Sequence, residues 1–253
     1  ELDKGNPINF SEKCKVSHLD LRKKARFEQK SWKKINTFVK DIRQSKKFKN
    51  IVNIGIGGSY LGPLTAYTAL KPFCDGPTVH FVSNLDPTSI SDVLSLCEQE
   101  TTLFIINSKS FTTGETLHNA ELAKSWLKKK NILIKNSFVS ATSSKVKALA
   151  WGIDEENVFD FDVGVGGRYS IWSPVGLPVM LAIGMQNFKS FLAGARVVDE
   201  HFLNTDIKEN VPLLMGLIRV WNRNFLEHSS HGIIPYDQRL SFFPSFIQQL
   251  EME

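Results

Sequence analysis

Hydrophobic runs alternate with segments of helical character over the middle of the chain. Four of these runs are nearly continuous and rich in β-branched and aromatic residues, and they cover residues 51–56, 78–83, 102–107 and 137–141. We expect helices between them, near residues 63–71, 87–97, 115–129 and 143–151. Apolar strands that alternate with helices indicate a parallel sheet with both faces covered. The pattern predicts an α/β fold with a doubly wound, mostly parallel sheet and helical flanking segments.

Helical spacing dominates both ends of the chain. Five apolar residues near the start recur at steps of three and four, as in an amphipathic helix, namely Trp32, Ile35, Phe38, Val39 and Ile42. Towards the other end we expect helices near residues 173–187, 188–203, 210–226 and 240–250. Three parts are therefore expected: a helical N-terminal segment (1–50), an α/β domain (51–160) and a mainly helical continuation (161–253).

Composition excludes several classes of protein. Of 253 residues, 42% are hydrophobic and 23% are charged, as in a folded globular protein rather than a disordered, collagen-like or coiled-coil chain. The three cysteines lie far apart and form no CxxC pair, so neither a disulfide scaffold nor a zinc ribbon is indicated. The first ten residues lack the apolar stretch of a secretory signal. These features predict a cytoplasmic protein.

One uncharged run raises the question of a membrane span. It extends from Tyr169 to Phe188 and has the length that a membrane helix needs. It also contains two prolines, two glycines and several polar side chains, so its hydrophobicity is low for a hydrocarbon environment. We expect a buried helix here and no membrane partner.

Positive charge is concentrated at the start of the chain. Residues 1–50 hold 15 Lys/Arg and 6 Asp/Glu, a local charge of +9, whereas the whole chain carries +5. This segment has neither zinc-finger spacing nor an RNP-like aromatic motif, so we expect a solvated helical face and no nucleic-acid partner. His228 and His231 match no metalloprotease pattern, and no metal site is expected.

The loop after the first strand is rich in glycine and reads GIGGSYLGP over residues 55–63. Tyr60 stands where a dinucleotide-binding fingerprint needs glycine, and the Gly-Lys pair of a Walker A loop is missing. What remains is a Gly-Gly-Ser turn that enters a helix, and we expect Pro63 in the first turn of that helix. Such a turn can present backbone N–H groups and the Ser59 hydroxyl to a small anion. A tight turn without a ligand is the alternative.

The loop after the third strand reads SKSFTTGET over residues 108–116 and carries five hydroxyl groups and one ammonium. It precedes a helix start, where unpaired N–H groups and the helix dipole favour an anion. The alternative is that Thr112 or Thr113 serves only as an N-cap, but a cap explains one hydroxyl and leaves Lys109 unexplained. Because ligands bind beyond the carboxyl ends of parallel strands, the two loops predict a site for a phosphomonoester.

Two further motifs gain meaning only in combination with these loops. Gly166 and Gly167 precede Arg168, so the backbone can pass close to a ligand and direct a permanent cation towards it. The chain ends with QQLEME, which by itself indicates little. No G-x-S-x-G motif is present, so a Ser-His-Asp hydrolase is not indicated.

The motifs GIGGSYLGP, SKSFTTGET, VGGRYSIWSPVG, IPYDQ and QQLEME occur in this order, and together they resemble the glucose-6-phosphate isomerase family. The resemblance covers about residues 50–253 and implies an SIS (sugar isomerase) type for the α/β domain. It also implies that the continuation leads into a second SIS region. The implied activity is the reversible interconversion of glucose 6-phosphate and fructose 6-phosphate through a cis-enediol, in glycolysis and gluconeogenesis, with no metal and no cofactor.

The resemblance assigns roles to individual residues. The phosphate-binding positions are Gly58, Ser59, Ser108, Lys109, Ser110, Phe111, Thr112 and Thr113. Arg168 matches the arginine that steadies the negative intermediate, Gln249 matches a substrate-contacting glutamine, and Glu253 matches the proton-transferring base. These roles are chemically coherent, because a carboxylate is a competent base for a carbon acid when a fixed cation stabilises the enediolate.

The sequence also departs from the family pattern. Asp162, Val163 and Gly164 stand where the family often has Trp-Asp-Trp, which affects a wall of the pocket. The family's second SIS domain would lie beyond Glu253, so the chain resembles a partial isomerase that we expect to be inactive alone and homodimeric at full length. The alternative is a non-catalytic SIS module that binds a phosphosugar. Arg168 and Glu253 favour the enzyme, because only the chemistry requires them.

Overall fold

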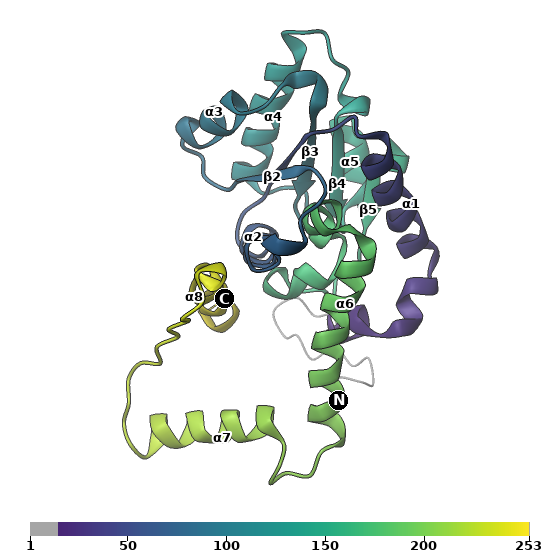
Figure 1. Cartoon of the computed structure of the whole chain (residues 1–253). Coiled ribbons are helices and arrows are strands. Elements are labelled where there is room, and N and C mark those ends of the chain that lie inside the picture. The colour runs from purple at the N-terminus through teal and green to yellow at the C-terminus, as the bar shows by residue number, and fades with distance from the viewer. Residues whose placement is uncertain (1–14, 253) are drawn as a thin grey trace.

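Five parallel strands form the centre of the molecule, in the order β2-β1-β3-β4-β5 (Figure 1). The structure, a computed structural model, describes residues 15–252. The strands are β1 (Asn50–Ile54), β2 (Thr78–Val82), β3 (Thr102–Asn107), β4 (Phe138–Thr142) and β5 (Val158–Asp160). The first four match the predicted strands. No strand was predicted at β5, because its three residues are too few to give a strand pattern.

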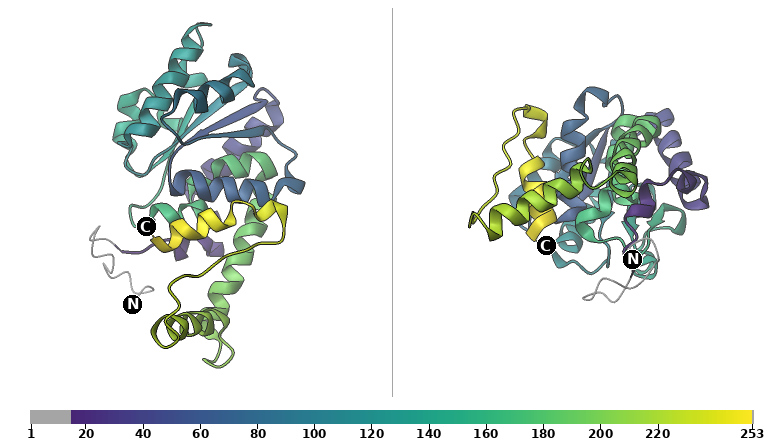
Figure 2. Two further views of the ribbon diagram at one scale, coloured as in Figure 1. Left: turned by 90° about the vertical axis from the view of Figure 1, so that its left-hand side faces the viewer. Right: turned by 90° about the horizontal axis from the view of Figure 1, so that it is seen from below.

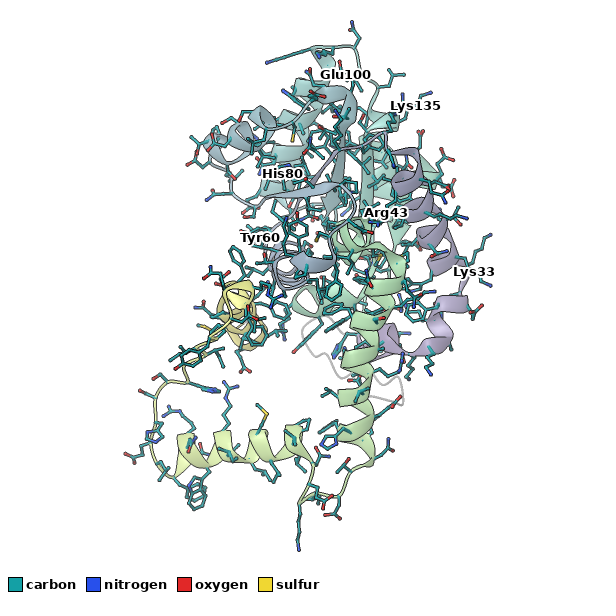
Figure 3. All side chains as sticks on the ribbon, viewed as in Figure 1. Lys33, Arg43, Tyr60, His80, Glu100 and Lys135 are labelled. Atoms are coloured by element: carbon teal, nitrogen blue, oxygen red, sulfur yellow. The ribbon has the colours of Figure 1, made fainter. Side chains whose placement is uncertain are left out.

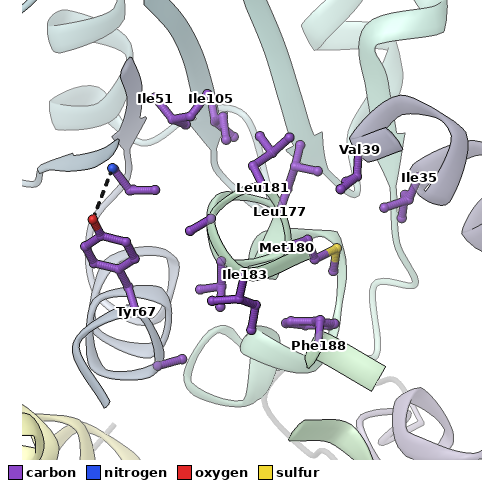
Figure 4. Packing of buried hydrophobic residues seen from close by; sticks show 14 of the residues in the cluster. Ile35, Val39, Ile51, Tyr67, Ile105, Leu177, Met180, Leu181, Ile183 and Phe188 are labelled. Atoms are coloured by element: carbon purple, nitrogen blue, oxygen red, sulfur yellow. Dashed lines mark hydrogen bonds between the residues drawn. The ribbon is translucent and has the colours of Figure 1, made fainter. Parts of the chain in front are cut away.

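Helices cover both faces of the sheet, because alternate residues of each strand point to opposite sides. One face packs on α1 (Lys30–Ser45), α2 (Gly58–Ala69) and α6 (Leu177–Asn204). Ile51 and Ile105 lie on that face, beside Leu181 of α6 (Figure 4). The other face packs on α3 (Pro87–Ser95), α4 (Gly114–Lys128) and α5 (Lys145–Trp151). The predicted doubly wound α/β fold is confirmed.

Helix α2 begins earlier than the sequence suggested. We expected Pro63 in its first turn, and this is wrong: the helix starts at Gly58, and Pro63 lies inside it. Gly57 has a φ of 59°, which turns the chain from β1 into the helix at once. A proline has no N–H, so the carbonyl of Ser59 loses its helical donor. The side-chain nitrogen of Asn53 replaces that donor, at 3.1 Å.

Two helices were expected near residues 173–187 and 188–203, and α6 does consist of two helical parts, which meet at a sharp kink at Gly184 (φ 79°, ψ 159°). Arg43 of α1 donates to the carbonyls of Leu181 and Ala182, at 2.7 and 3.1 Å, and so pairs backbone groups beside the kink (Figure 3). Residues 177–183 are fully buried, as expected for the uncharged run. None of the helices formed by residues 15–252 combines the length and apolar character that a membrane span requires.

Beyond α6 the chain leaves the sheet and returns to it. Helix α7 (Val211–Asn224) stands apart from the sheet and has no buried residue, and Met215, Ile218 and Trp221 are exposed on it (Figure 1). Helix α8 (Phe243–Met252) then packs against α2 (Figures 1 and 2). This return places the end of the described chain beside the turn that follows β1.

Candidate functional site

The two predicted loops leave adjacent strands at the point where the strand order reverses. The chain runs from β1 to β2 on one side and then crosses to β3 on the other side of β1, so β1 and β3 mark a topological switch point. Residues 55–59 follow β1, and residues 108–113 follow β3. Ligands of open α/β sheets bind in the crevice at such a point. The sheet therefore brings the two loops to one place, as the sequence analysis expected.

The Gly-Gly-Ser turn makes two close approaches to other segments. A methyl group on Gly58 would overlap the carbonyl of Gly167 and lie 2.7 Å from the backbone nitrogen of Arg168. A methyl group on Gly57 would lie 2.9 Å from Nε2 of Gln249. Only glycine fits at Gly58, since the opposing atoms are backbone atoms. The start of α2 thus lies directly against the segment that carries Arg168 and against α8.

The loop after β3 holds its hydroxyl groups in two pairs. Oγ of Ser108 lies 3.2 Å from Oγ1 of Thr113, and Oγ of Ser110 lies 2.7 Å from Oγ1 of Thr112. Thr113 occupies the N-cap position of α4, but its side chain makes no capping hydrogen bond. The capping alternative therefore does not account for these hydroxyls. The N–H groups at the start of α4 remain available to an anion.

Backbone contacts fix the middle of this loop. The carbonyl of Lys109 accepts three hydrogen bonds, from N and Oγ of Ser143 and from Oγ1 of Thr142, at 2.8–3.0 Å. Phe111 has a φ of 51°, which a bulky residue rarely adopts, and it is only 3% exposed, with its ring in the core. Phe111 therefore anchors the loop, while Ser110 and Thr112 on either side of it stay exposed.

Arg168 lies on a short 3-10 helix, η8 (Gly167–Trp172), packed on α2. Its guanidinium carbon is 5.0 Å from the ring centre of Tyr169. Nε of Arg168 is buried and has no hydrogen-bond partner within residues 15–252. A buried guanidinium nitrogen without a partner is costly, and an anionic ligand would satisfy it.

The other two predicted residues belong to the end of the chain. Gln249 lies on α8 and contacts the Gly57 turn, so the structure brings it to the loops. Glu253 lies outside the described residues. No group of three or more His, Cys, Asp or Glu within residues 15–252 is arranged to hold a metal ion. The described site is instead a set of hydroxyls, helix N-termini, one lysine and one arginine, which can bind a phosphate ester.

The Asp162 segment, where the sequence departs from the family pattern, packs on the start of the described chain. Oδ1 of Asp162 accepts hydrogen bonds from Oγ of Ser17 at 3.0 Å and from the N–H of Gly164 at 2.7 Å. The N–H of Ser17 donates to the carbonyl of Gly164 at 3.0 Å. The wall beside Arg168 is therefore built partly from N-terminal residues.

Sequence reasoning missed His18, which these contacts place beside the site. Its ring stacks on Tyr169 with centroids 4.3 Å apart. Burial lowers the pKa of His18 from 6.5 to about 4; the positive charges of Arg22 and Arg168 add to this, and Asp199 opposes it. No local pattern could have revealed His18, because its partners lie on η8 and α6.

The pKa of His18 predicts a pH-dependent stability. The unfolded chain binds a proton on His18 near pH 6.5, and the folded chain only near pH 4. The stability gained by keeping His18 neutral is therefore fully present above pH 6.5 and is lost as the pH falls towards 4. Allowing for partial exposure, we expect the native chain to lose about 1 kcal/mol more free energy of unfolding between pH 7 and pH 5 than His18→Gln does. Urea titrations at both pH values measure this, with the exposed His231→Gln as control. Equal losses in the native chain and His18→Gln would contradict the prediction.

The sequence matches known proteins over its whole length. A family model described as "Phosphoglucose isomerase" matches residues 1–253. Glucose-6-phosphate isomerases of Rhizobium etli and Agrobacterium fabrum are each 44% identical over 100% of this chain and 51% of their own length. The crystal structure of a glucose-6-phosphate isomerase from Chlamydia trachomatis superposes with a TM-score of 0.86 at 34% identity, over 98% of this chain and 51% of that one.

The chain thus spans about half the length of the curated relatives it matches. A second crystal structure, of a hypothetical protein from Thermus thermophilus, has a TM-score of 0.75 at 28% identity, over 98% of this chain and 57% of that one. This chain belongs to the phosphoglucose isomerase family.

Proposed function

We propose that the protein, at the full length of its relatives, interconverts glucose 6-phosphate and fructose 6-phosphate, and that the described residues form the phosphate-binding side of its active site. The observation that carries this proposal is the contact of Gly58 with Gly167 and Arg168. This contact joins an anion-binding turn to a permanent cation at the switch point. The family membership supports the same reaction.

In the proposed mechanism each group has one task. The phosphate is held by the N–H of Gly58, by the N–H groups at the start of α4, and by the side chains of Ser59, Ser108, Lys109, Ser110, Thr112 and Thr113, while Phe111 anchors the loop. Glu253 moves the proton between C1 and C2 of the sugar, and Arg168 stabilises the negative charge of the enediolate. Gln249 contacts the sugar. The reaction transfers a proton and has no net redox change, so it needs no cofactor.

We further propose that the chain is organised as an N-terminal helical segment (1–50), a first SIS domain (51–160) and a helical continuation towards a second SIS region (161–253). We propose that the full-length protein is a homodimer in the cytoplasm. Its ligand is a phosphosugar, and it does not bind nucleic acid. The exposed apolar side chains of α7 support association, since large apolar patches on a free surface are unfavourable. Sedimentation of the full-length protein tests this, and a monomer would contradict it.

Calorimetry with this chain tests the phosphate site directly. Fructose 6-phosphate is expected to bind in the presence of a chelator, whereas fructose is not, because the described groups recognise the phosphate. Equal binding of the two sugars, or no binding of either, would overturn the proposal. Loss of fructose 6-phosphate binding on adding the chelator would show that a metal is required.

Lys109→Ala is expected to weaken fructose 6-phosphate binding by about 1.5–3 kcal/mol, the contribution of a charge-assisted hydrogen bond. Calorimetric titration measures the difference. Lys135→Ala is the matched control, because Lys135 is exposed in the short helix before β4, at the opposite end of the strands (Figure 3). Equal affinity of the native chain and Lys109→Ala would remove Lys109 from the site.

A further inference from the structure

Two asparagines lie fully buried at the switch point, inside otherwise apolar strands. Asn53 is on β1 and Asn107 ends β3, and both have an exposed fraction of 0%. Neither can touch a ligand in solution. A buried amide is unfavourable unless its donors and acceptors are paired, so the partners of these side chains explain why asparagine stands there.

The two side chains form one continuous line of hydrogen bonds. Nδ2 of Asn107 donates to Oδ1 of Asn53 at 2.5 Å and to the carbonyl of Val175 at 3.2 Å. Nδ2 of Asn53 donates to the carbonyl of Ser59 at 3.1 Å. Both hydrogens of Asn107 therefore reach acceptors, which fixes the orientation of its amide. Its Oδ1 has no hydrogen-bond partner within residues 15–252.

One end of this line satisfies a carbonyl that the sequence itself leaves open. In α2 the carbonyl of Ser59 would normally accept from residue 63, but Pro63 has no N–H. Asn53 supplies the missing donor. The Gly-Gly-Ser turn is therefore tied to the sheet through a side chain and not only through the backbone.

The other end continues to the Arg168 segment. The N–H of Val175 donates to Oγ of Ser173, which itself donates to the carbonyl of Ser170 at 2.6 Å. Oγ of Ser170 donates to the carbonyl of Gly167, also at 2.6 Å. Gly167 is the residue that faces Gly58. Hydrogen bonds and peptide bonds thus link Ser59, through Asn53 and Asn107, to the backbone that carries Arg168.

The middle of the line adjoins the hydroxyl-rich loop, because Asn107 is followed directly by Ser108. We propose that Asn53 and Asn107 are positioning residues, which hold the turn after β1, the loop after β3 and the Arg168 segment in one arrangement. The expected consequence is that phosphosugar affinity depends on two side chains that no ligand touches, and this consequence rests on the proposed function.

The competing explanation is that the two asparagines contribute only to general stability. The two explanations predict different effects when the asparagines are replaced by an apolar pair. An apolar pair of similar shape would avoid the orphaned oxygen of Asn107 and can leave stability nearly unchanged. It would, however, leave the carbonyls of Ser59 and Val175 without these donors. Loop order and ligand affinity should therefore change even where the free energy of unfolding does not.

Amide hydrogen exchange on this chain tests the proposal, with Asn107→Leu, Asn53→Leu and the double variant. The informative amides are those of Tyr60, Leu61, Tyr169 and Ser173, all hydrogen-bonded in the two segments. We expect their exchange to accelerate about tenfold in each variant, and the double variant to match a single one, because each change breaks the same line. Asn107→Ala replaces Asn107→Leu if the larger side chain prevents folding.

Ser140→Ala is the matched control. Oγ of Ser140 is buried on the neighbouring strand β4 and donates to the carbonyl of Ile106 at 3.1 Å, so its loss removes a similar bond without touching the loops. Exchange at the four amides that stays within twofold of the native chain in both asparagine variants would overturn the proposal. So would equal acceleration in Ser140→Ala.

Fructose 6-phosphate titration provides the second readout. Affinity is expected to fall about tenfold in each asparagine variant and to stay unchanged in Ser140→Ala. Unchanged affinity in the asparagine variants would overturn the positioning role. If the native chain binds no phosphosugar, the proposed function fails, and the exchange rates still decide whether the asparagines position the loops.

Discussion

Glu253→Gln is expected to lower kcat by about 10²- to 10⁴-fold in a form of the protein with the full length of its relatives, with little change in KM. The amide keeps the size and shape of the carboxylate but cannot accept a proton from carbon. The loss is expected in kcat because, in the proposed site, groups other than Glu253 hold the phosphate. A coupled assay that follows reduced nicotinamide as fructose 6-phosphate becomes glucose 6-phosphate measures both constants.

Glu251→Gln is the matched control for this prediction. Glu251 lies two positions before Glu253, forms an ion pair with Arg219 of α7 and is exposed. Its substitution removes one negative charge from the same part of the chain without removing the proposed base. If kcat of Glu253→Gln stays within a factor of about three while KM rises, Glu253 binds substrate and another group is the base.

Gly58→Ala is expected to abolish phosphosugar binding and to cost about 3 kcal/mol of unfolding free energy, at the upper end of the range for overpacking. The added methyl group would overlap the carbonyl of Gly167, so the α2 turn and the Arg168 segment must separate. Both segments are backbone, and neither can rotate away as a side chain would. Urea unfolding and calorimetric titration with fructose 6-phosphate measure the two effects.

Gly194→Ala controls for the exchange of glycine for alanine in a helix. A methyl group on Gly194, an exposed residue of α6 outside the proposed site, would meet no atom within 4 Å. We expect it to leave binding unchanged and to raise stability by up to about 1 kcal/mol, since alanine favours the helix. Gly58→Ala with native affinity would show that the two segments need not touch for the site to work.

Several positions show where sequence reasoning stopped. The strands were predicted because continuous apolar runs need no information beyond their own residues. Pro63 was misplaced, because its tolerance inside α2 depends on a donor from Asn53 on another element. The two helical parts of α6 were predicted, but the break at Gly184 was not located, because the carbonyl of Leu181 beside it is paired by Arg43 from α1. Asn53 and Asn107 could have been singled out from the sequence, because each is a polar residue within an otherwise apolar strand.

Local residue patterns were enough to predict the parallel α/β sheet and the two loops at its carboxyl edge, since strand runs and turn residues are local properties of the chain. The segments that those loops contact became known only from the packing of the folded chain. Gly58 touches Gly167, Gln249 touches Gly57, and His18 stacks on Tyr169, although each pair is far apart in the sequence. Such contacts depend on how whole elements pack, and no spacing within one segment records the geometry of another.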